Sequence, residues 1–271
     1  NVAAVATFGN VAGRTGGSDG LRVEFAEGLA ARGHDLALVA RRGDRLEALA
    51  DEIAATGKPR PLVVAMDLAP ADAPGKLASA LAQAGAQVEY LVNNAGYGLN
   101  GAFADLPIDD QLGMIDLNIR SLTAMAHQFL PDLKATRGGM LNVASVAAYG
   151  PGPNMAIYYA SKAYVLSFTE ALHEEMRPTG VRVTALCPGP VATGFQARAG
   201  MGGKALQQQS GFPGARETVV AGYDGLMAGR RVVTPGLANQ ALVAGLAWIP
   251  HAISLPRMAA RHAGRKGGAG K

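Results

Sequence analysis

The chain has 271 residues, of which 49% are hydrophobic and 17% are charged, and its formal net charge is +4. This length and composition suit one α/β domain with a substantial core, and they exclude an intrinsically disordered chain. The positive excess comes from residues 251–271, which hold five basic residues and no acid, while aromatic residues make up only 6% of the chain. We therefore expect no nucleic-acid partner.

The use of cysteine and the lengths of the apolar runs bear on location. Cys187 is the only cysteine, which excludes an intramolecular disulfide and fits a reducing compartment. No run reaches the roughly 18 uninterrupted apolar residues of a membrane span. The start of the chain also lacks the basic region of a secretory signal. These features predict a cytoplasmic protein.

Short apolar runs alternate with amphipathic stretches along the chain. The runs that suit buried strands are Leu36–Ala40, Pro61–Met66, Val88–Val92, Met140–Ala144, Val181–Cys187 and, more weakly, Arg231–Thr234. The helical stretches are Val23–Arg32, Asp44–Thr56, Asp72–Ala84, Asp109–Lys134, Tyr158–Arg177 and Glu217–Ala228. This alternation predicts a doubly wound, Rossmann-type parallel sheet in a three-layer α/β/α domain that spans residues 1–271.

Two segments fall outside that alternation. Residues 194–216 contain six glycines and are interpreted either as a flexible loop over the substrate or as an ordinary loop. Residues 237–271 form a C-terminal extension. The overlapping stretch from Pro235 to Arg265 is apolar and then basic. It is expected to cap the substrate pocket, to pack on a partner subunit, or to lie on an anionic membrane surface. We favour the first two.

A tyrosine and a lysine stand four residues apart in one predicted helix. At that spacing Tyr158 and Lys162 share a helix face, and an ammonium beside a phenol lowers the phenol's pKa from about 10 toward neutrality. The phenol then serves as a proton donor and acceptor. Ser145 lies thirteen residues before Tyr158, where its hydroxyl can hold a substrate oxygen beside the phenol.

These residues belong to a larger set of motifs that resembles the short-chain dehydrogenase/reductase family. The matching elements, in the family's order from about residue 15 to about residue 193, are Asn93-Asn94-Ala95-Gly96, Asp116-Leu117-Asn118, Asn142-Val143-Ala144-Ser145, Tyr158-Tyr159-Ala160-Ser161-Lys162 and Pro188-Gly189-Pro190-Val191-Ala192-Thr193. The resemblance implies a catalytic tetrad of Asn118, Ser145, Tyr158 and Lys162. In that family tyrosine is the acid/base, serine positions the substrate oxygen, lysine also binds the nicotinamide ribose, and asparagine supports a water that relays protons.

The glycine-rich turn of that family matches less well. Its T-G-x-x-x-G-x-G pattern is met by Thr15, Gly16 and Gly20, but Arg22 replaces the last glycine. Gly16 and Gly20 can admit the pyrophosphate, and Ser18 can cap the helix or touch phosphate. Arg22 is too large for the close packing that the last glycine permits. The strand expected before the turn is irregular, with Gly13 and Arg14 at apolar positions. Either the turn is divergent, or the sequence contains an error there.

The end of the second strand bears on the choice of cofactor. Arg41 and Arg42 stand there, with no acid before Asp44, which favours NADP over NAD because arginine pairs with the 2′-phosphate. Alternatively, both arginines only solvate a loop. The resemblance further implies that Asp67 contacts adenine and that Asn93, Ala95 and Gly96 line the adenosine side. It also implies that Pro188, Gly189, Val191 and Thr193 close over the nicotinamide.

Together these observations predict an NADP(H)-dependent oxidoreductase that moves a hydride between nicotinamide and a small, lipophilic carbonyl compound or secondary alcohol. The five histidines have no metal-ligand spacing, so we expect no metal. The resemblance implies a homodimer or homotetramer through the helices of 109–134 and 158–177, the alternative being a monomer. The alternative function is a non-catalytic nucleotide-binding or scaffold protein on the same fold, for which Arg22 and the irregular first strand are the reasons.

Overall fold

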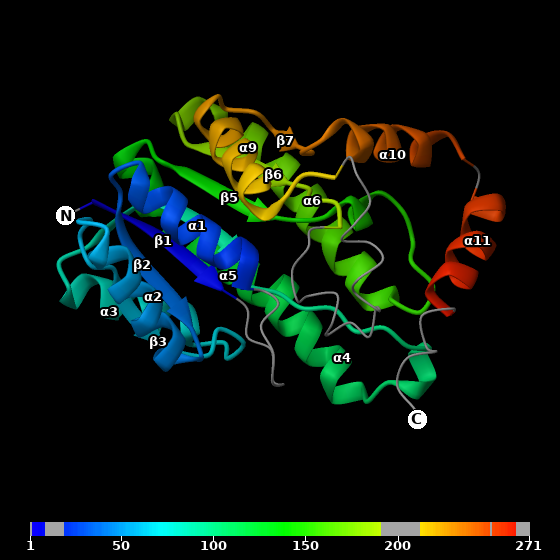
Figure 1. Cartoon of the computed structure of the whole chain (residues 1–271), viewed down its shortest axis with the longest axis horizontal. Helices are drawn as coiled ribbons and strands as arrows, with labels where there is room; N and C mark the ends of the chain where they lie inside the picture. The colour runs from blue at the N-terminus through cyan, green and yellow to red at the C-terminus, as the bar shows by residue number, and fades with distance from the viewer. Residues whose placement is uncertain (1, 9–18, 191–211, 250, 264–271) are drawn as a thin grey trace.

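The structure is a computed structural model, and it describes residues 2–8, 19–190, 212–249 and 251–263 (Figure 1). Its centre is a seven-stranded sheet of order β3-β2-β1-β4-β5-β6-β7, in which every pairing is parallel. The strands are β1 Val2–Phe8, β2 Asp35–Ala40, β3 Leu62–Ala65, β4 Gln87–Asn94, β5 Gly139–Val143, β6 Arg182–Leu186 and β7 Val232–Val233. The predicted doubly wound α/β fold is confirmed.

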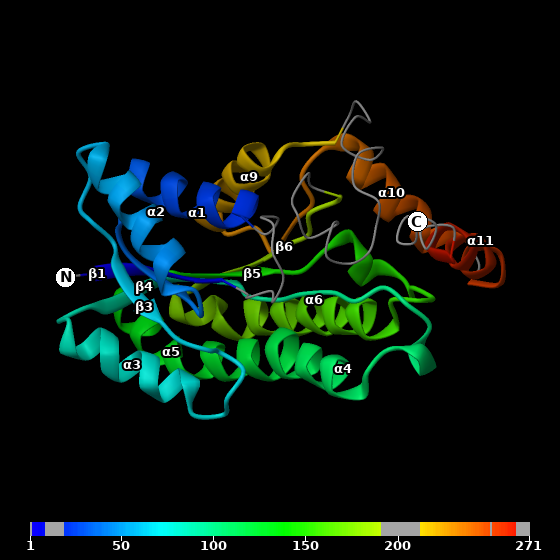
Figure 2. The same ribbon diagram turned by 60° about the horizontal axis from the view of Figure 1, so that its bottom comes forward.

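Helices cover both faces of the sheet. Their bounds are α1 Asp19–Ala31, α2 Gly43–Ala55, α3 Ala73–Gln83, α4 Ile108–Ile115, α5 Leu122–Thr136, α6 Ala156–Met176, α9 Ala215–Met227, α10 Leu237–Trp248 and α11 His251–Ala263. Figure 2 shows α1, α2 and α9 on one face and α3, α5 and α6 on the other. Each face has its own apolar core, with Phe25 and Leu46 buried in the first and Leu77 and Phe129 in the second.

The first strand corrects the interpretation of the N-terminal segment. β1 spans Val2–Phe8, pairs with β2 and β4, and buries Ala4, Val5 and Ala6 at the middle of the sheet. A strand covered on both faces must be apolar, and this segment is regular in that sense. The prediction of an irregular strand that includes Gly13 and Arg14 is therefore wrong. Those two residues lie outside the described part of the chain.

The helix expected over residues 109–134 is interrupted. Between α4 and α5 lies a π-helical segment, η2, which spans Asp116–Ser121. A π turn inserts an extra residue into the helical ladder and is frequent at functional sites. Asn118 lies in this segment, so the side chain that the motif singled out is presented where the helix changes its winding.

The C-terminal extension forms two helices beyond β7. α10 and α11 lie past the end of the sheet in Figure 1, and α10 packs against η3, the short helix Val146–Tyr149. Of the glycine-rich range 194–216, residues 212–216 are described, and α9 already begins at Ala215. The rest of that range lies outside the described residues. Within the described residues no helix is long and apolar enough to cross a bilayer.

Candidate active site

The serine of the predicted tetrad follows β5 at the carboxyl edge of the sheet. Ser145 caps η3, where its Oγ accepts a hydrogen bond from the backbone N–H of Ala147 at 3.1 Å. The same hydroxyl donates to the backbone oxygen of Pro188 at 3.4 Å, and the N–H of Val146 donates to that oxygen at 2.9 Å. The serine is thus held between the end of β5 and the turn that follows β6.

Tyr158 and Lys162 lie one turn apart near the start of α6, as their spacing predicts, and both are buried. The hydroxyls of Tyr158 and Ser145 share a hydrogen bond. The Nζ of Lys162 is 5.9 Å from the centre of the Tyr158 ring and donates to the backbone oxygen of Val143 at 2.7 Å. The structure therefore brings these three predicted residues together.

The electrostatics of this group correct one expectation. Burial raises the pKa of Tyr158 above its ordinary value, although the hydrogen bond with Ser145 acts in the opposite direction. Burial also lowers the pKa of Lys162 to about 8. The predicted lowering of the phenol's pKa by the ammonium is not found, because loss of solvent penalises the charged form of both groups. The ammonium of Lys162 also donates its hydrogen bond to the backbone oxygen of Val143 rather than to the phenol.

Asn118 is almost fully buried and joins three parts of the structure. Its Nδ2 donates to the backbone oxygen of Tyr97 at 2.9 Å and to the Oγ of Ser161 at 3.0 Å. Its Oδ1 accepts from the N–H of Tyr97 at 3.0 Å. The side chain thereby fixes the segment after β4 against α6. Its position in the tetrad stays a prediction, since these contacts by themselves explain its burial.

Two groups of predicted cofactor residues lie at the same edge of the sheet. The guanidinium of Arg41, after β2, is 3.8 Å from a carboxylate oxygen of Asp67, after β3, and both side chains are partly exposed. A Cβ added to Gly96 would lie 2.9 Å from the Oδ1 of Asn118 and 3.7 Å from the Nζ of Lys162. The carboxamide of Asn118 therefore fills the place that a side chain at position 96 would need, which explains glycine there.

The remaining predicted cofactor residues divide into those the structure describes and those it does not. Gly20 lies in the first turn of α1, and Ala95 packs against the second core. Arg22 is buried while α1 still packs on β1 and β2, so the helix accommodates it. Gly16, Ser18, Val191 and Thr193 lie outside the described residues.

The donors of the site fit a ligand that carries hydroxyl groups. A lysine ammonium has three protons to donate, and among the described residues Val143 is the one acceptor found for that of Lys162. A buried donor without a partner is costly, so the remaining protons favour a hydroxyl-bearing group at this position. Gly96 lies beside it. These residues fit the sugar of a nucleotide.

Comparison with known proteins decides the family. The sequence pattern of the family described as short chain dehydrogenase matches residues 10–202, which is more than half of the chain. The chain belongs to the short-chain dehydrogenase family. The resemblance inferred from the motifs is confirmed, and the family pattern ends before α9, α10 and α11.

Named relatives are similar in sequence to about two thirds of this chain. Very-long-chain 3-oxoacyl-CoA reductase of Macaca fascicularis is 36% identical over 184 residues, which are 66% of this chain and 58% of that protein. Sulfoacetaldehyde reductase 2 of Chromohalobacter salexigens is 37% identical over 184 residues, which are 67% of this chain and 72% of that protein. The matched region thus spans little more than half of the oxoacyl-CoA reductase.

Solved structures share the fold. A short-chain dehydrogenase from Sphingobium yanoikuyae, in complex with NADPH, has a TM-score of 0.74 and 27% identity, covering 94% of this chain and 99% of that one. A short chain dehydrogenase/reductase from Burkholderia phymatum, in complex with NAD, has a TM-score of 0.74 and 24% identity, covering 89% of this chain and 92% of that one. The second likeness shows the fold alone.

The sequence motifs did not predict a chain of polar side chains that joins two strands to a helix beneath the site. The Nδ2 of Asn93 donates to the Oδ1 of Asn142 at 2.9 Å, and the Nδ2 of Asn142 donates to the Oγ1 of Thr169 at 3.0 Å. This chain of bonds ties β4 and β5 to α6. Asn93 thereby holds the ends of the two central strands together beneath the site. Thr169 stands seven residues after Lys162, a helical spacing that could have indicated a shared face.

Cys187 is buried directly after β6. The hydroxyl of Tyr149 donates to its Sγ at 3.8 Å, and burial raises the thiol's pKa to about 11. A thiol with that pKa is a poor nucleophile at neutral pH. This environment is that of a packing residue at the end of a strand.

A small cavity of about 40 Å³ adjoins Tyr158 on the side of α4. Its apolar lining consists of Leu99, Phe103, Leu106, Met114, Met155 and Ile157. The side chain of Gln111 also borders it, but its Nε2 is occupied by the backbone oxygens of Phe103 and Leu106, each at 3.0 Å. The described surroundings of the phenol on this side are therefore predominantly apolar.

Proposed function

We propose that the chain is an NADP(H)-dependent oxidoreductase that transfers a hydride between nicotinamide and a carbonyl or secondary-alcohol carbon, with Tyr158 as the acid/base. The observation that carries this proposal is the buried hydrogen bond between Tyr158 and Ser145, with the Lys162 ammonium 5.9 Å from the phenol ring. Two hydroxyls that point at one another define a position where a single substrate oxygen can contact both.

The protein's part in the chemistry follows from these groups. Bound nicotinamide supplies or accepts the hydride. During reduction, negative charge grows on the carbonyl oxygen, the Ser145 hydroxyl donates a hydrogen bond to that oxygen, and Tyr158 transfers its phenolic proton to it. The phenolate left on Tyr158 is stabilised by the Lys162 ammonium, because attraction between charges is stronger away from water. In the alcohol-oxidising direction the same proton returns to Tyr158.

The preference for NADP rests on Arg41. Its guanidinium lies at the end of β2 beside Asp67 and is partly exposed, so it is able to pair with a 2′-phosphate. The Sphingobium dehydrogenase, which is in complex with NADPH, supports this choice. In the same proposal Lys162 holds the nicotinamide ribose, Gly96 lines the adenosine side and Asp67 contacts the adenine. The roles predicted for Gly16, Ser18, Gly20, Val191 and Thr193 are unchanged.

A lipophilic substrate suits the apolar lining beside Tyr158. Leucine, methionine, phenylalanine and isoleucine side chains border Tyr158 there, and a charged substrate group placed against them would lose its solvation. Of the relatives, the very-long-chain 3-oxoacyl-CoA reductases act, by that name, on a substrate with a long chain, whereas sulfoacetaldehyde reductase 2 acts, by that name, on a small charged aldehyde, so the proposal rests on the apolar lining. A cytoplasmic location agrees with the free thiol of Cys187.

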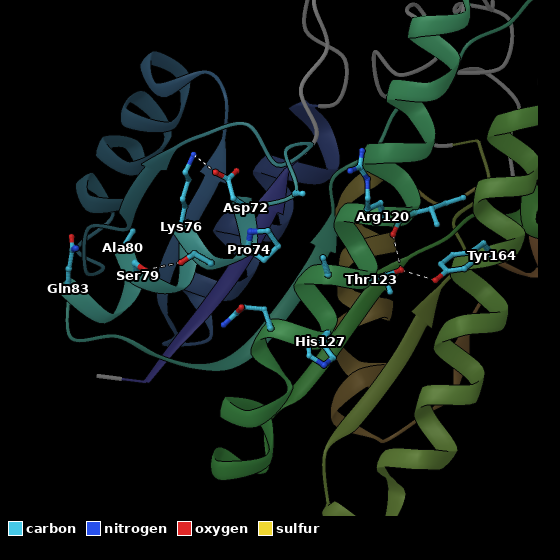
Figure 3. A pocket seen from close by; sticks show the side chains of 15 residues that line it. Asp72, Pro74, Lys76, Ser79, Ala80, Gln83, Arg120, Thr123, His127 and Tyr164 are labelled. Carbon is cyan, nitrogen blue, oxygen red and sulfur yellow. Dashed lines mark hydrogen bonds and ion pairs between the residues drawn. The ribbon is translucent and has the colours of Figure 1, made fainter.

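We further infer that two copies assemble through α5 and α6. A groove of about 1140 Å³ runs between α3 and α5 and reaches α6 (Figure 3). On its α6 side the hydroxyl of Tyr164 lies 2.8 Å from that of Thr123, and the Tyr164 ring stacks on Phe168 with centroids 5.8 Å apart. This partly exposed aromatic pair on α6, tied to α5 through Thr123, is suited to burial by a partner.

The test of the proposed activity is turnover of a panel of lipophilic ketones with NADPH. Tyr158→Phe removes the proton donor, so turnover is expected to fall at least about a hundredfold. Tyr164→Phe is the matched control, since it removes a hydroxyl from a partly exposed tyrosine on the same helix, and it should retain activity. Equal turnover by wild type and Tyr158→Phe on every active ketone would refute the mechanism.

The alternative of a nucleotide-binding scaffold loses one of its two reasons, because β1 is buried and pairs with a strand on each side. It predicts that NADPH raises the unfolding temperature by mass action while no ketone is turned over. The same panel of ketones therefore separates the two functions.

A further inference from the structure

Asn239 is a fully buried amide in the first turn of α10. Its Nδ2 donates to the backbone oxygen of Pro235 at 2.7 Å. Its Oδ1 has no hydrogen-bond partner within the described part of the chain. Buried polar atoms nearly always have such a partner, so an orphaned oxygen points to some other constraint that keeps asparagine at this position.

That constraint is the close approach of Asn239 to Gly189. A Cβ built on Gly189 would lie 1.9 Å from the Oδ1 of Asn239 and within 2.6 Å of its amide carbon and nitrogen. The carboxamide therefore fills the volume that any other residue's side chain would need at position 189. Its oxygen lies on the side of the glycine's second α-hydrogen, which is a weak donor. The structure thus explains the glycine of the Pro188-Gly189 motif by contact with a residue fifty positions later.

The Pro188–Gly189 turn also supports Ser145. The backbone oxygen of Pro188 accepts from the N–H of Val146 and from the hydroxyl of Ser145. A hydroxyl has one proton and two lone pairs. The contacts with Pro188 and with the N–H of Ala147 hold the Ser145 oxygen beside the phenol of Tyr158, and its one proton turns from Pro188 to a substrate oxygen when the substrate binds. A shift of the turn would therefore redirect the hydroxyl on which the substrate oxygen depends.

We propose that Asn239 is a positioning residue for the reaction. By filling the space beside Gly189 it fixes the Pro188 carbonyl, and through that carbonyl it fixes the Ser145 hydroxyl. The proposal rests on the proposed function in one respect, namely that Ser145 holds the substrate oxygen. It assigns a role to α10, a helix that lies beyond the region matched by the family pattern.

The neighbouring residue provides a matched control. The Nε2 of Gln240 donates to the backbone oxygen of Thr234 at 3.0 Å, so it too ties α10 to the turn before it through a carboxamide. Gln240 is exposed, and the three atoms nearest to a Cβ on Gly189 all belong to Asn239. Comparing Asn239→Ala with Gln240→Ala therefore separates anchoring of α10 from support of the Pro188–Gly189 turn.

Two double-mutant cycles test the proposal, and the first of them is measured by kcat. Asn239→Ala should lower kcat about tenfold, since small displacements of a catalytic group cost that much or more, while Gln240→Ala should leave kcat unchanged. In the Ser145→Ala variant, the additional change Asn239→Ala should cause no further loss of kcat. A merely structural role would lower kcat by the same factor in both backgrounds, and that result would overturn the proposal.

The second cycle tests the contact itself and does not depend on catalysis. Gly189→Ala places a methyl group against the carboxamide and should lower both the unfolding temperature and kcat. Asn239→Ala makes room for that methyl, so the Gly189→Ala/Asn239→Ala pair should be less impaired than the sum of the two single changes. Additive losses in unfolding temperature would refute the contact.

Failure of the inference is distinguishable from failure of the proposed function. If Ser145→Ala has wild-type turnover, the proposed role of Ser145 is wrong, and the role of Asn239 falls with it. If Ser145→Ala is impaired but Asn239→Ala matches Gln240→Ala, the proposed function stands and the inference about Asn239 is wrong.

Discussion

The ammonium of Lys162 donates a 2.7 Å hydrogen bond to the backbone oxygen of Val143, the last residue of β5. This bond holds the lysine of α6 against the end of the strand that leads to Ser145. It also places a charged group where almost no solvent reaches, and burial lowers its pKa to about 8. The position of the lysine is therefore set by the sheet, and its charge is destabilised by the same packing.

The buried lysine should give the stability of the protein a characteristic pH dependence. Its folded-state pKa of about 8 lies below the ordinary value of 10.5, so between these values the unfolded state binds more protons and stability rises with pH. Relative to Lys162→Met, the wild type should gain roughly 3 kcal/mol from pH 8 to pH 10.5 and nothing below pH 8. Urea unfolding of both proteins across this range measures the difference. A constant difference would show that Lys162 is not desolvated.

The phenol of Tyr158 should resist ionisation in the protein without cofactor. Burial raises its pKa above the ordinary value of 10, because the phenolate would be formed away from water. The tyrosinate absorbance of wild type minus Tyr158→Phe should therefore show no titration between neutrality and pH 10. A difference signal in that interval would restore the simpler expectation that Lys162 acidifies the phenol, and addition of NADP⁺ to the same titration would report any effect of the cofactor.

Cofactor preference should depend on Arg41. Removing a guanidinium that pairs with the 2′-phosphate costs a charge-assisted hydrogen bond, so Arg41→Ala should lower kcat/KM for NADPH by about 10–100-fold and leave that for NADH nearly unchanged. Arg60→Ala is the matched control, since Arg60 also pairs with acids, Glu47 and Asp51, but precedes β3 at the opposite edge of the sheet. Parallel losses with both nucleotides would argue against a 2′-phosphate site.

The assembly proposed through α5 and α6 should be sensitive to charge in the groove between α3 and α5. Ala124 lines that groove and is half-buried, so Ala124→Glu would place an unpaired carboxylate in the interface and should convert the dimer to a monomer. Ala241→Glu, on an exposed part of α10, is the control. Light scattering after size exclusion gives the mass of each. A wild-type monomer would remove this proposal without affecting the catalytic one.

Much of the fold was predictable because its signals are local. The apolar runs and helical stretches that alternate along the chain specify a parallel sheet, since strands buried on both faces must be apolar throughout. The Tyr158–Lys162 spacing likewise places both side chains on one helix face, whatever the rest of the protein does. The position of the first strand could not be predicted from the glycine motif, because β1 ends at Phe8, eleven positions before α1 begins at Asp19.

The tertiary structure alone decided what depends on elements distant in sequence. The spacing predicted that the Lys162 ammonium and the Tyr158 phenol would be neighbours. The pKa of Tyr158 is raised and that of Lys162 is lowered because β5, η3 and α4 bury both groups, and no local pattern predicts that burial. In the same way, Gly189 was recognisable as a motif residue, yet its contact with Asn239 arises only when α10 folds back onto the turn after β6. Periodicity is a property of consecutive residues, while desolvation and steric fit are properties of whatever the completed fold brings alongside them.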